Sequence, residues 1–246
     1  SGGWLNSIKV TMGFLELGAA MKFLSNSDLV WNWGVFTKPV VLSVWIVISM
    51  MMGFYLLGKI KLPHDSKVDF ISVPRLVLSI IFISFGLYLT AGLFGNSIHG
   101  LINSYLPPEV NSVENIEDNV NNNHAEWITN FDEGLIKAKK LNKPIFIDFT
   151  GYTCTNCRWM ETNVFVDSRV QDLFDNFILV QLFTDGGENY RENQQMEIDR
   201  FGTAALPFYV ILDPDDQELA RFPGMDPDVN KFIKFLNISL ERFNDK

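Results

Sequence analysis

The chain has 246 residues, of which 47% are hydrophobic, enough for one large domain or two smaller units with apolar cores. The net charge of −9 is uneven: residues 1–108 hold seven Lys and Arg against four Asp and Glu, and the acidic excess lies in the remainder. An acidic chain without a Lys/Arg cluster argues against a nucleic-acid-binding protein.

The amino-terminal segment is already apolar when the chain begins at Ser1, and it shows no signal-peptide pattern. We therefore expect a fragment, or a processed chain, whose targeting information lies upstream. Residues 4–24 carry Lys9, Glu16 and Lys22. Two interpretations stay open for this segment, an interfacial amphipathic helix and a third membrane span that faces protein rather than lipid.

Two longer apolar runs follow. Residues 39–58, between Lys38 and Lys59, contain no charged residue, and residues 76–94 form a second uncharged run after Arg75. Twenty helical residues at 1.5 Å per residue span a hydrocarbon core of about 30 Å. A buried helix of a soluble protein is the alternative, but the length and proximity of the runs favour transmembrane helices. We thus expect residues 1–106 to form a transmembrane helical region of about three spans.

The loops of this region predict its orientation. Residues 59–75 contain four basic side chains, Lys59, Lys61, Lys67 and Arg75, whereas the connection at residues 26–34 contains none. The positive-inside rule places residues 59–75 in the cytoplasm and everything after residue 94 on the other side of the membrane. Thiols in an extracytoplasmic compartment tend to be oxidised.

An acidic, Asn-rich linker is expected at residues 107–123, which begin with Pro-Pro and are poor in aromatic residues. From residue 124 to residue 246, helical and strand patterns alternate. Helices are expected at residues 130–143, 156–165, 188–201 and 229–243, and strands at 144–150, 177–183, 207–213 and 217–222. The last two strands read as a hairpin turned at 213–216. This order predicts an α/β domain with a mixed central sheet and helices on both faces.

The only two cysteines, Cys154 and Cys157, follow the first of these strands. Haem attachment would need His where Arg158 stands. A structural zinc site needs four ligands, and histidine occurs only at positions 64, 99 and 124. A purely structural disulfide in so short a loop would restrain little of the unfolded chain. A redox pair at a helix N-terminus, where a thiolate is stabilised, is the favoured interpretation.

The stretches FIDFTGYTCTNC (146–157) and ALPFYVIL (205–212) resemble the thioredoxin-like superfamily. The resemblance implies a thioredoxin-like fold for residues 124–246, with a cis-proline at Pro207 facing the cysteines. It also implies that Asp148, six positions before Cys154, is a buried acid beneath the pair.

With its membrane segment, the whole chain resembles the carboxy-terminal part of the DsbD family of thiol:disulfide interchange proteins. Residues 1–24, 45–66 and 76–94 resemble the last three membrane helices of that family, and Glu161 matches a family Glu four positions after the second cysteine. Two departures stand out. The earlier part of the family pattern, including a cysteine pair in the membrane domain, is absent, and Thr153 replaces a common Trp.

The resemblance implies a role for each site residue. Cys154 would be the attacking thiol and Cys157 the resolving thiol, while Asp148 and Glu161 would tune their pKa values and manage the proton. Substrate-binding residues are expected at Tyr152, Thr155, Asn156, Leu206 and Pro207. No metal or dissociable cofactor is implied.

The expected function is a membrane-tethered protein-disulfide reductase of the bacterial inner membrane, multi-pass, with its thioredoxin-like domain in the periplasm. The resemblance implies electron transfer from upstream membrane-domain thiols to an amino-terminal periplasmic domain. That domain would in turn serve periplasmic thiol–disulfide proteins, including isomerases and cytochrome c maturation factors. Membrane lipid is the other expected partner, and nucleic acid is not expected to be one. A membrane-anchored disulfide oxidase or isomerase, and a non-catalytic scaffold with an inert disulfide, remain alternatives.

Overall fold

A computed structural model of the chain describes residues 2–31, 33–63, 65, 70–96, 98, 101–107 and 127–245. The chain divides into two compact units, one built mainly from residues 32–102 with the helix before them and one mainly from residues 110–246. The expected linker at 107–123 lies almost wholly outside the described residues. The boundaries 1–106, 107–123 and 124–246 therefore stay predictions.

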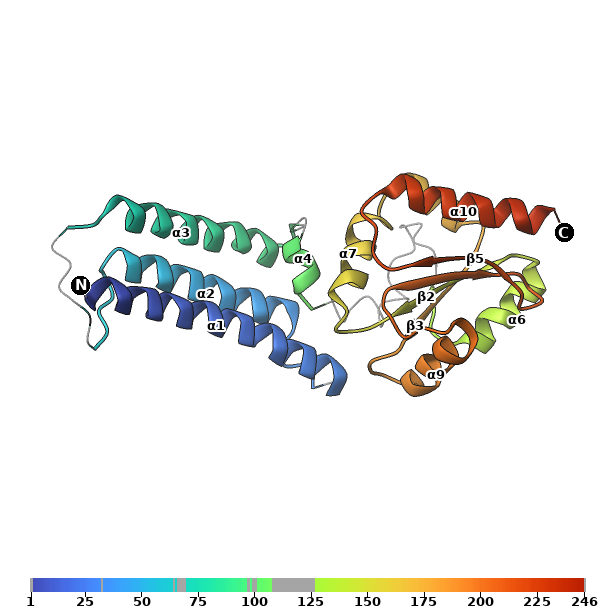
Figure 1. Ribbon diagram of the computed structural model, residues 1–246, viewed down its shortest axis with the longest axis horizontal. Coiled ribbons are helices and arrows are strands. Elements are labelled where there is room, and N and C mark those ends of the chain that lie inside the picture. Colours follow the sequence, from blue (N-terminus) through green and yellow to red (C-terminus); the bar gives the residue numbers. More distant parts are fainter. Residues whose placement is uncertain are drawn as a thin grey trace. The chain divides into compact units, whose positions relative to one another are not determined.

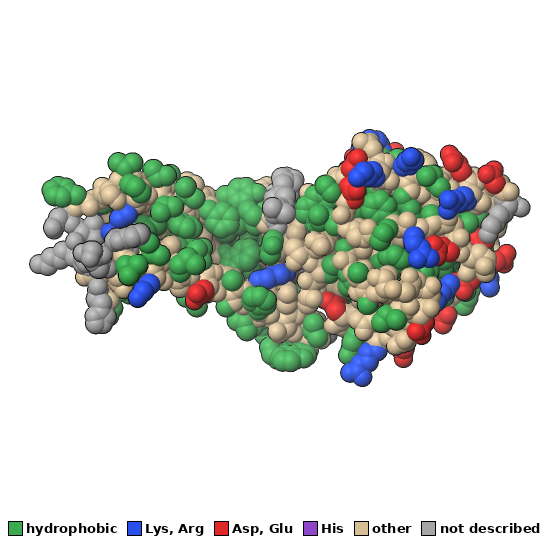
Figure 2. Space-filling view, viewed as in Figure 1, with side chains coloured by type: hydrophobic (Ala, Val, Ile, Leu, Met, Phe, Trp, Pro, Cys, Tyr) green, Lys and Arg blue, Asp and Glu red, His purple; other side chains and the backbone are tan. Residues whose placement is uncertain are grey.

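The first unit is helical. Its helices are α1 (Gly2–Trp31), α2 (Lys38–Leu56), α3 (Val73–Leu93) and the short α4 (Leu101–Tyr105). Figure 1 shows α1, α2 and α3 side by side. Of the described helices, α2 and α3 are long and apolar enough to cross a membrane, and they correspond to the two uncharged runs. Figure 2 shows hydrophobic side chains gathered over this unit and most charged side chains over the other.

The first connection is shorter than the sequence predicts. We expected a turn at residues 26–34, but α1 continues to Trp31. Asp28, within the helix, is buried and accepts hydrogen bonds from the backbone N–H groups of Val35 (3.2 Å) and Phe36 (2.8 Å). Because this carboxylate binds the backbone beyond the turn, a few residues suffice to reverse the chain.

Close packing joins α2 and α3, and a hydrogen bond links α2 to α1. The hydroxyl of Ser79 on α3 donates to the backbone oxygen of Gly53 on α2 (2.9 Å), and a Cβ atom at Gly53 would lie 2.5 Å from Ile83. The indole N–H of Trp45 on α2 donates to the backbone oxygen of Gly18 on α1 (2.9 Å). Small residues and interhelical hydrogen bonds of this kind hold helices together where lipid removes the hydrophobic driving force.

The second unit is a five-stranded sheet with helices on both faces. Its elements are β1 (Trp127–Ile128), α6 (Phe131–Leu141), β2 (Ile145–Thr150), α7 (Thr155–Asn163), α8 (Ser168–Phe174), β3 (Ile178–Phe183), α9 (Tyr190–Phe201), β4 (Phe208–Leu212), β5 (Glu218–Pro223) and α10 (Val229–Asn244). The strand order is β1-β3-β2-β4-β5, in which β1, β3 and β2 are parallel and β4 and β5 are antiparallel. The mixed sheet and the β4–β5 hairpin are confirmed.

Two elements of this unit escaped the sequence analysis. Strand β1 has only two residues, too few to show the alternation of apolar and polar side chains that indicates a strand. The helix expected to run to residue 165 ends at Asn163, and α8 begins a few residues later. Asp167 caps α8 by accepting a hydrogen bond from the backbone N–H of Arg169 (3.0 Å).

The two faces of the sheet carry separate cores. One core packs β-sheet residues such as Phe146 against α7, α8 and α10, and the other packs residues such as Ile147 against α6 and α9 (Figure 1). Because side chains alternate along a strand, Asp148 lies on the same face of β2 as Phe146. The fold therefore places this acid on the face that α7 covers.

Candidate active site

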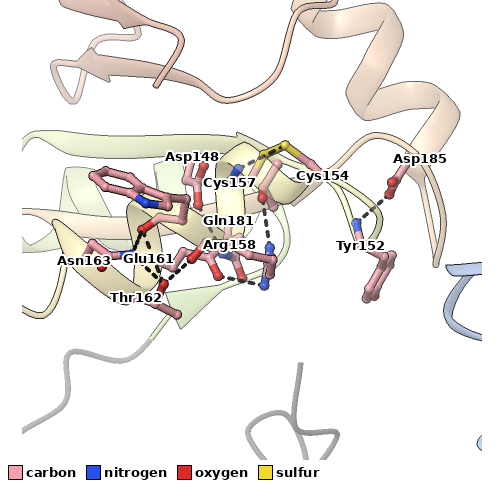
Figure 3. Close-up of polar contacts among 12 residues, drawn as sticks. Asp148, Tyr152, Cys154, Cys157, Arg158, Glu161, Thr162, Asn163, Gln181 and Asp185 are labelled. Carbon is pink, nitrogen blue, oxygen red and sulfur yellow. Dashed lines mark hydrogen bonds and ion pairs between the residues drawn. A yellow bond between two sulfur atoms is a disulfide. The ribbon is translucent and has the colours of Figure 1, made fainter. Parts of the chain in front are cut away.

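The cysteine pair lies where β2 leads into α7. Cys154 is the N-cap residue of α7 and Cys157 lies in its first turn; the two form a disulfide with Cα atoms 5.3 Å apart (Figure 3). Cys157 is fully buried, whereas Cys154 is only half-buried. The backbone N–H of Cys157 donates to the sulfur of Cys154 (3.1 Å). Cys154 is thus the accessible sulfur, and the N-terminus of α7 stabilises its thiolate.

Asp185, just after β3, holds the loop that precedes the cysteines. Its carboxylate accepts hydrogen bonds from the backbone N–H groups of Tyr152 (2.7 Å) and Thr153 (2.9 Å) and from the Thr153 hydroxyl (2.7 Å). A Cβ atom at Gly151 would lie 2.7 Å from this carboxylate, so a side chain there would displace the group that holds the loop. The sequence analysis missed Asp185. It is an acid in a loop 31 positions after Cys154, and nothing in the sequence links it to the cysteines.

The structure brings the two predicted acids together. Asp148 is 1% exposed, and its register partners are Gln181 on β3 and Tyr209 on β4. The side-chain amide of Gln181 donates to Asp148 Oδ2 (3.1 Å) and to Glu161 Oε1 (3.3 Å). A single amide on β3 therefore bridges a strand acid and a helix acid, and Gln181 is a second residue that the sequence did not indicate.

Arg158, the residue after Cys157, completes this cluster. One guanidinium nitrogen forms an ion pair with Glu161 Oε2 (2.7 Å), and another donates to the hydroxyl of Thr150 (3.0 Å). The side chains of Arg158 and Glu161 are only 12% and 20% exposed. At the sequence level Arg158 served only to exclude haem attachment, although its i,i+3 spacing to Glu161 is a recognisable helical pair.

Burial raises the pKa of both Asp148 and Glu161, because a carboxylate loses its hydration inside the protein. The hydrogen bond from Gln181 and the charge of Arg158 lower the pKa of Asp148, and Arg158 lowers that of Glu161. Burial also raises the pKa of the Tyr209 hydroxyl. Asp148 Oδ1 and the Tyr209 hydroxyl are buried without a hydrogen-bond partner among the described residues.

The expected substrate-binding residues lie on the loop before α7, at the start of α7 and in the segment that leads into β4. Pro207 is buried, follows a cis peptide bond from Leu206, and directly precedes the register pair Phe208–Phe149 that adjoins the site. Leu206 is half-buried and packs on the α6/α9 core. Thr155 is half-buried and Asn156 exposed at the start of α7. Tyr152 belongs to the loop before α7, and its ring stacks on Phe183 of β3 with centroids 4.1 Å apart.

Comparisons with known proteins match the domain that contains the cysteine pair and most of the chain. A family model described as thioredoxin-like matches residues 126–214. The chain is 23% identical over 211 residues to a thiol:disulfide interchange protein DsbD of Campylobacter jejuni, with 85% of this chain and 33% of the relative covered. A DsbD of Pseudoalteromonas atlantica is 24% identical over 228 residues, covering 89% and 33%. A thioredoxin structure from Thermus thermophilus is 25% identical, covering 46% of this chain and 84% of that one, with a TM-score of 0.39.

The chain spans about a third of the length of the curated relatives it matches. The matched domain surrounds the Cys154–Cys157 disulfide, and the similarity to DsbD also includes the helical unit, since it covers 85% or more of the chain. Residues 126–214 thus match a thioredoxin-like family model around the Cys154–Cys157 disulfide, and the chain is similar over most of its length to the DsbD thiol:disulfide interchange proteins.

Proposed function

We propose that the chain is a membrane-tethered protein-disulfide reductase that passes electrons by thiol–disulfide exchange from membrane-domain thiols to periplasmic partners. The observation that carries this proposal is the pairing of a half-buried Cys154 at a helix N-terminus with a fully buried Cys157 above a cluster of carboxyl groups. Thiol–disulfide exchange needs one sulfur that a partner can reach, here Cys154, and a second sulfur shielded from partners, here Cys157.

The exchange conserves atoms and electrons. The Cys154 thiolate attacks a partner disulfide; a Cys154–partner S–S bond forms, the partner bond breaks, and one partner thiolate leaves and takes a proton. Cys157 then loses its proton to a nearby carboxylate and attacks Cys154. The Cys154–Cys157 bond forms, the mixed disulfide breaks, and the second partner sulfur takes a proton. Two electrons and two protons have passed to the partner.

The source and destination of these electrons follow from the resemblance to DsbD. Residues 1–153 contain no cysteine, so the chain needs a reductant with its own thiols. We propose the membrane-domain thiols of a longer protein as that reductant. An amino-terminal periplasmic domain, and through it disulfide isomerases and cytochrome c maturation factors, would be the recipients. Tyr152, Thr155, Asn156, Leu206 and Pro207 would form the surface on which an extended partner segment docks.

The reduction potential of the Cys154–Cys157 pair tests the direction of this chemistry. We expect a reduction potential of about −270 mV, as in thioredoxin, and not one of about −120 mV, as in a strong oxidant. The measurement is equilibration of the chain in detergent micelles with glutathione or dithiothreitol buffers, and the Cys154→Ser variant is its control. A value near that of the oxidant would instead support the oxidase or isomerase. A value far below both, without thiol exchange, would support an inert scaffold.

A topology reporter tests the compartment. The basic residues between α2 and α3 motivate a cytoplasmic loop there and an external second unit. After residue 123, a fused reporter that functions only outside the cytoplasm should be active, and one that functions only in the cytoplasm should be inactive. For reporters inserted in residues 59–75 we expect the cytoplasmic reporter alone to be active. Cytoplasmic activity at the first site would contradict the periplasmic assignment.

A further inference from the structure

Glu197 on α9 is a buried acid that the thiol chemistry does not use. The residue is 0% exposed, and neither of its carboxyl oxygens has a hydrogen-bond partner among the described residues. It differs in this from Asp148 and Glu161, which share the amide of Gln181. An unpaired carboxylate inside an apolar core is costly, so a buried acid without a donor favours its uncharged form.

Helical spacing determines where Glu197 lies. Asn193, Glu197 and Phe201 are four residues apart, so they share one face of α9, and α9 lies against β3 (Figure 1). The side-chain amide of Asn193 donates to the backbone oxygen of Phe183, the last residue of β3 (2.9 Å). The ring of Phe201 packs on that of Phe149 on β2, with centroids 5.7 Å apart. Glu197 therefore lies between these two contacts, over the apolar face of the sheet that α6 and α9 cover.

The titratable groups on the elements around Glu197 do not compensate its charge. Strand β3 carries none, and Asp148 of β2 and Tyr209 of β4 belong to the opposite face of the sheet. The other charged side chains of α9 are exposed, and the guanidinium of Arg221 on β5 lies over the ring of Phe201 (5.8 Å). Burial raises the pKa of the Glu197 carboxyl to about 7, and no charge in the described part of the chain offsets this rise. The remaining groups are, on α9, Tyr190, Arg191, Glu192, Asp199 and Arg200, and, on α6, Asp132, Glu133, Lys137, Lys139 and Lys140.

Both ends of α9 lead directly into parts of the candidate active site. Asp185, shortly before α9, holds the backbone of Tyr152 and Thr153. Leu206 and Pro207 follow shortly after α9, and Leu206 packs on the same core as the helix. Because both connections are short, a movement of α9 away from the sheet displaces both segments.

We propose that Glu197 is a positioning residue: its uncharged form holds α9 on the sheet, and its ionised form releases α9 together with the loop that Asp185 holds and the segment Leu206–Pro207. The consequence for partner docking rests on the proposed function, whereas the proton dependence of α9 does not.

The direction of the pH effect follows from linkage. When α9 opens, Glu197 meets water and its pKa returns to about 4.3. The stability that the uncharged acid gives the closed helix is fully present below this value. It is lost as the pH rises through the folded value of about 7.

Amide hydrogen exchange in the oxidised whole chain, in detergent micelles, tests the proposal. After correction for the intrinsic exchange rate, protection of the α9 amides should fall about tenfold between pH 6 and pH 8. The amides of Tyr152 and Thr153 donate to Asp185, and those of Gly202 and Ala205 are hydrogen-bonded just before Leu206–Pro207. These four amides should lose protection together with α9.

Three variants isolate the role of Glu197. Glu197→Gln keeps the shape of the side chain without its ionisation, so protection of α9 should change less than about twofold over the same pH range. Glu197→Leu is a second neutral variant, apolar like the core around it, and should behave in the same way. Glu192→Gln makes the identical chemical change at an exposed position of α9 and should keep the pH dependence of wild type.

The proposal is overturned if wild type and both neutral variants lose the same protection between pH 6 and pH 8. It is also overturned if α9 opens while the amides of Tyr152, Thr153, Gly202 and Ala205 stay protected. Because the oxidised chain transfers no electrons in this measurement, these outcomes stand apart from failure of the proposed function. That failure would show as a reduced wild-type chain unable to reduce a protein disulfide.

Discussion

Replacing Cys157 with Ser should convert the chain into a trap for its partners. Cys154 is half-buried at the N-terminus of α7, so it still attacks a partner disulfide. Without the Cys157 sulfur nothing resolves the mixed disulfide, and the complex accumulates. The measurement is the yield of complexes that dithiothreitol releases, seen on non-reducing gels after expression in a bacterial membrane and acid quenching.

The matched control is Cys154→Ser. It retains one cysteine, but the remaining sulfur of Cys157 is fully buried and cannot reach a partner in the folded domain. We expect few or no complexes, at least tenfold fewer than with Cys157→Ser. Equal trapping by the two single variants would mean that the attacking and resolving roles are wrongly assigned.

Part of this site could be predicted because its chemistry is local in sequence. Cys154, Cys157 and Glu161 lie within eight residues on one helix, so their relative placement follows from helical geometry. Asp148 stands out as the one acid of an apolar strand that leads directly to the cysteines. The mixed sheet with helices on both faces was equally accessible, since short apolar runs alternating with amphipathic helices admit few architectures.

The partners of these groups could not be predicted because they come from elements distant in sequence. Gln181 meets Asp148 only because β2 and β3 pair in parallel in one register, and a shift of one residue would turn its amide to the other face. Asp185 binds the loop at Tyr152 and Thr153 because β3 ends beside β2. Neither residue belongs to a recognisable motif, so only the three-dimensional arrangement assigns it.

Neutralising both acids should make Cys154 more acidic. Asp148 and Glu161 share the amide of Gln181 on the face covered by α7, and a carboxylate near a thiol opposes its ionisation. In the variant Asp148→Asn/Glu161→Gln, Arg158 remains as an uncompensated cation next to the cysteines. Both changes favour the thiolate, so we expect the pKa of Cys154 to fall.

The expected size of this fall is about one pKa unit, which corresponds to about 1.4 kcal/mol of coupling between the acids and the thiol. Below the midpoint it means about tenfold more thiolate, and alkylation that is faster by the same factor. The test is the pH dependence of the alkylation rate, compared with wild type and with Asp199→Asn, an exposed acid on α9. Because the acids and thiols titrate together, the midpoint belongs to the cluster and not to one residue. An unchanged midpoint would reduce both acids to structural residues and leave the N-terminus of α7 as the main influence on Cys154.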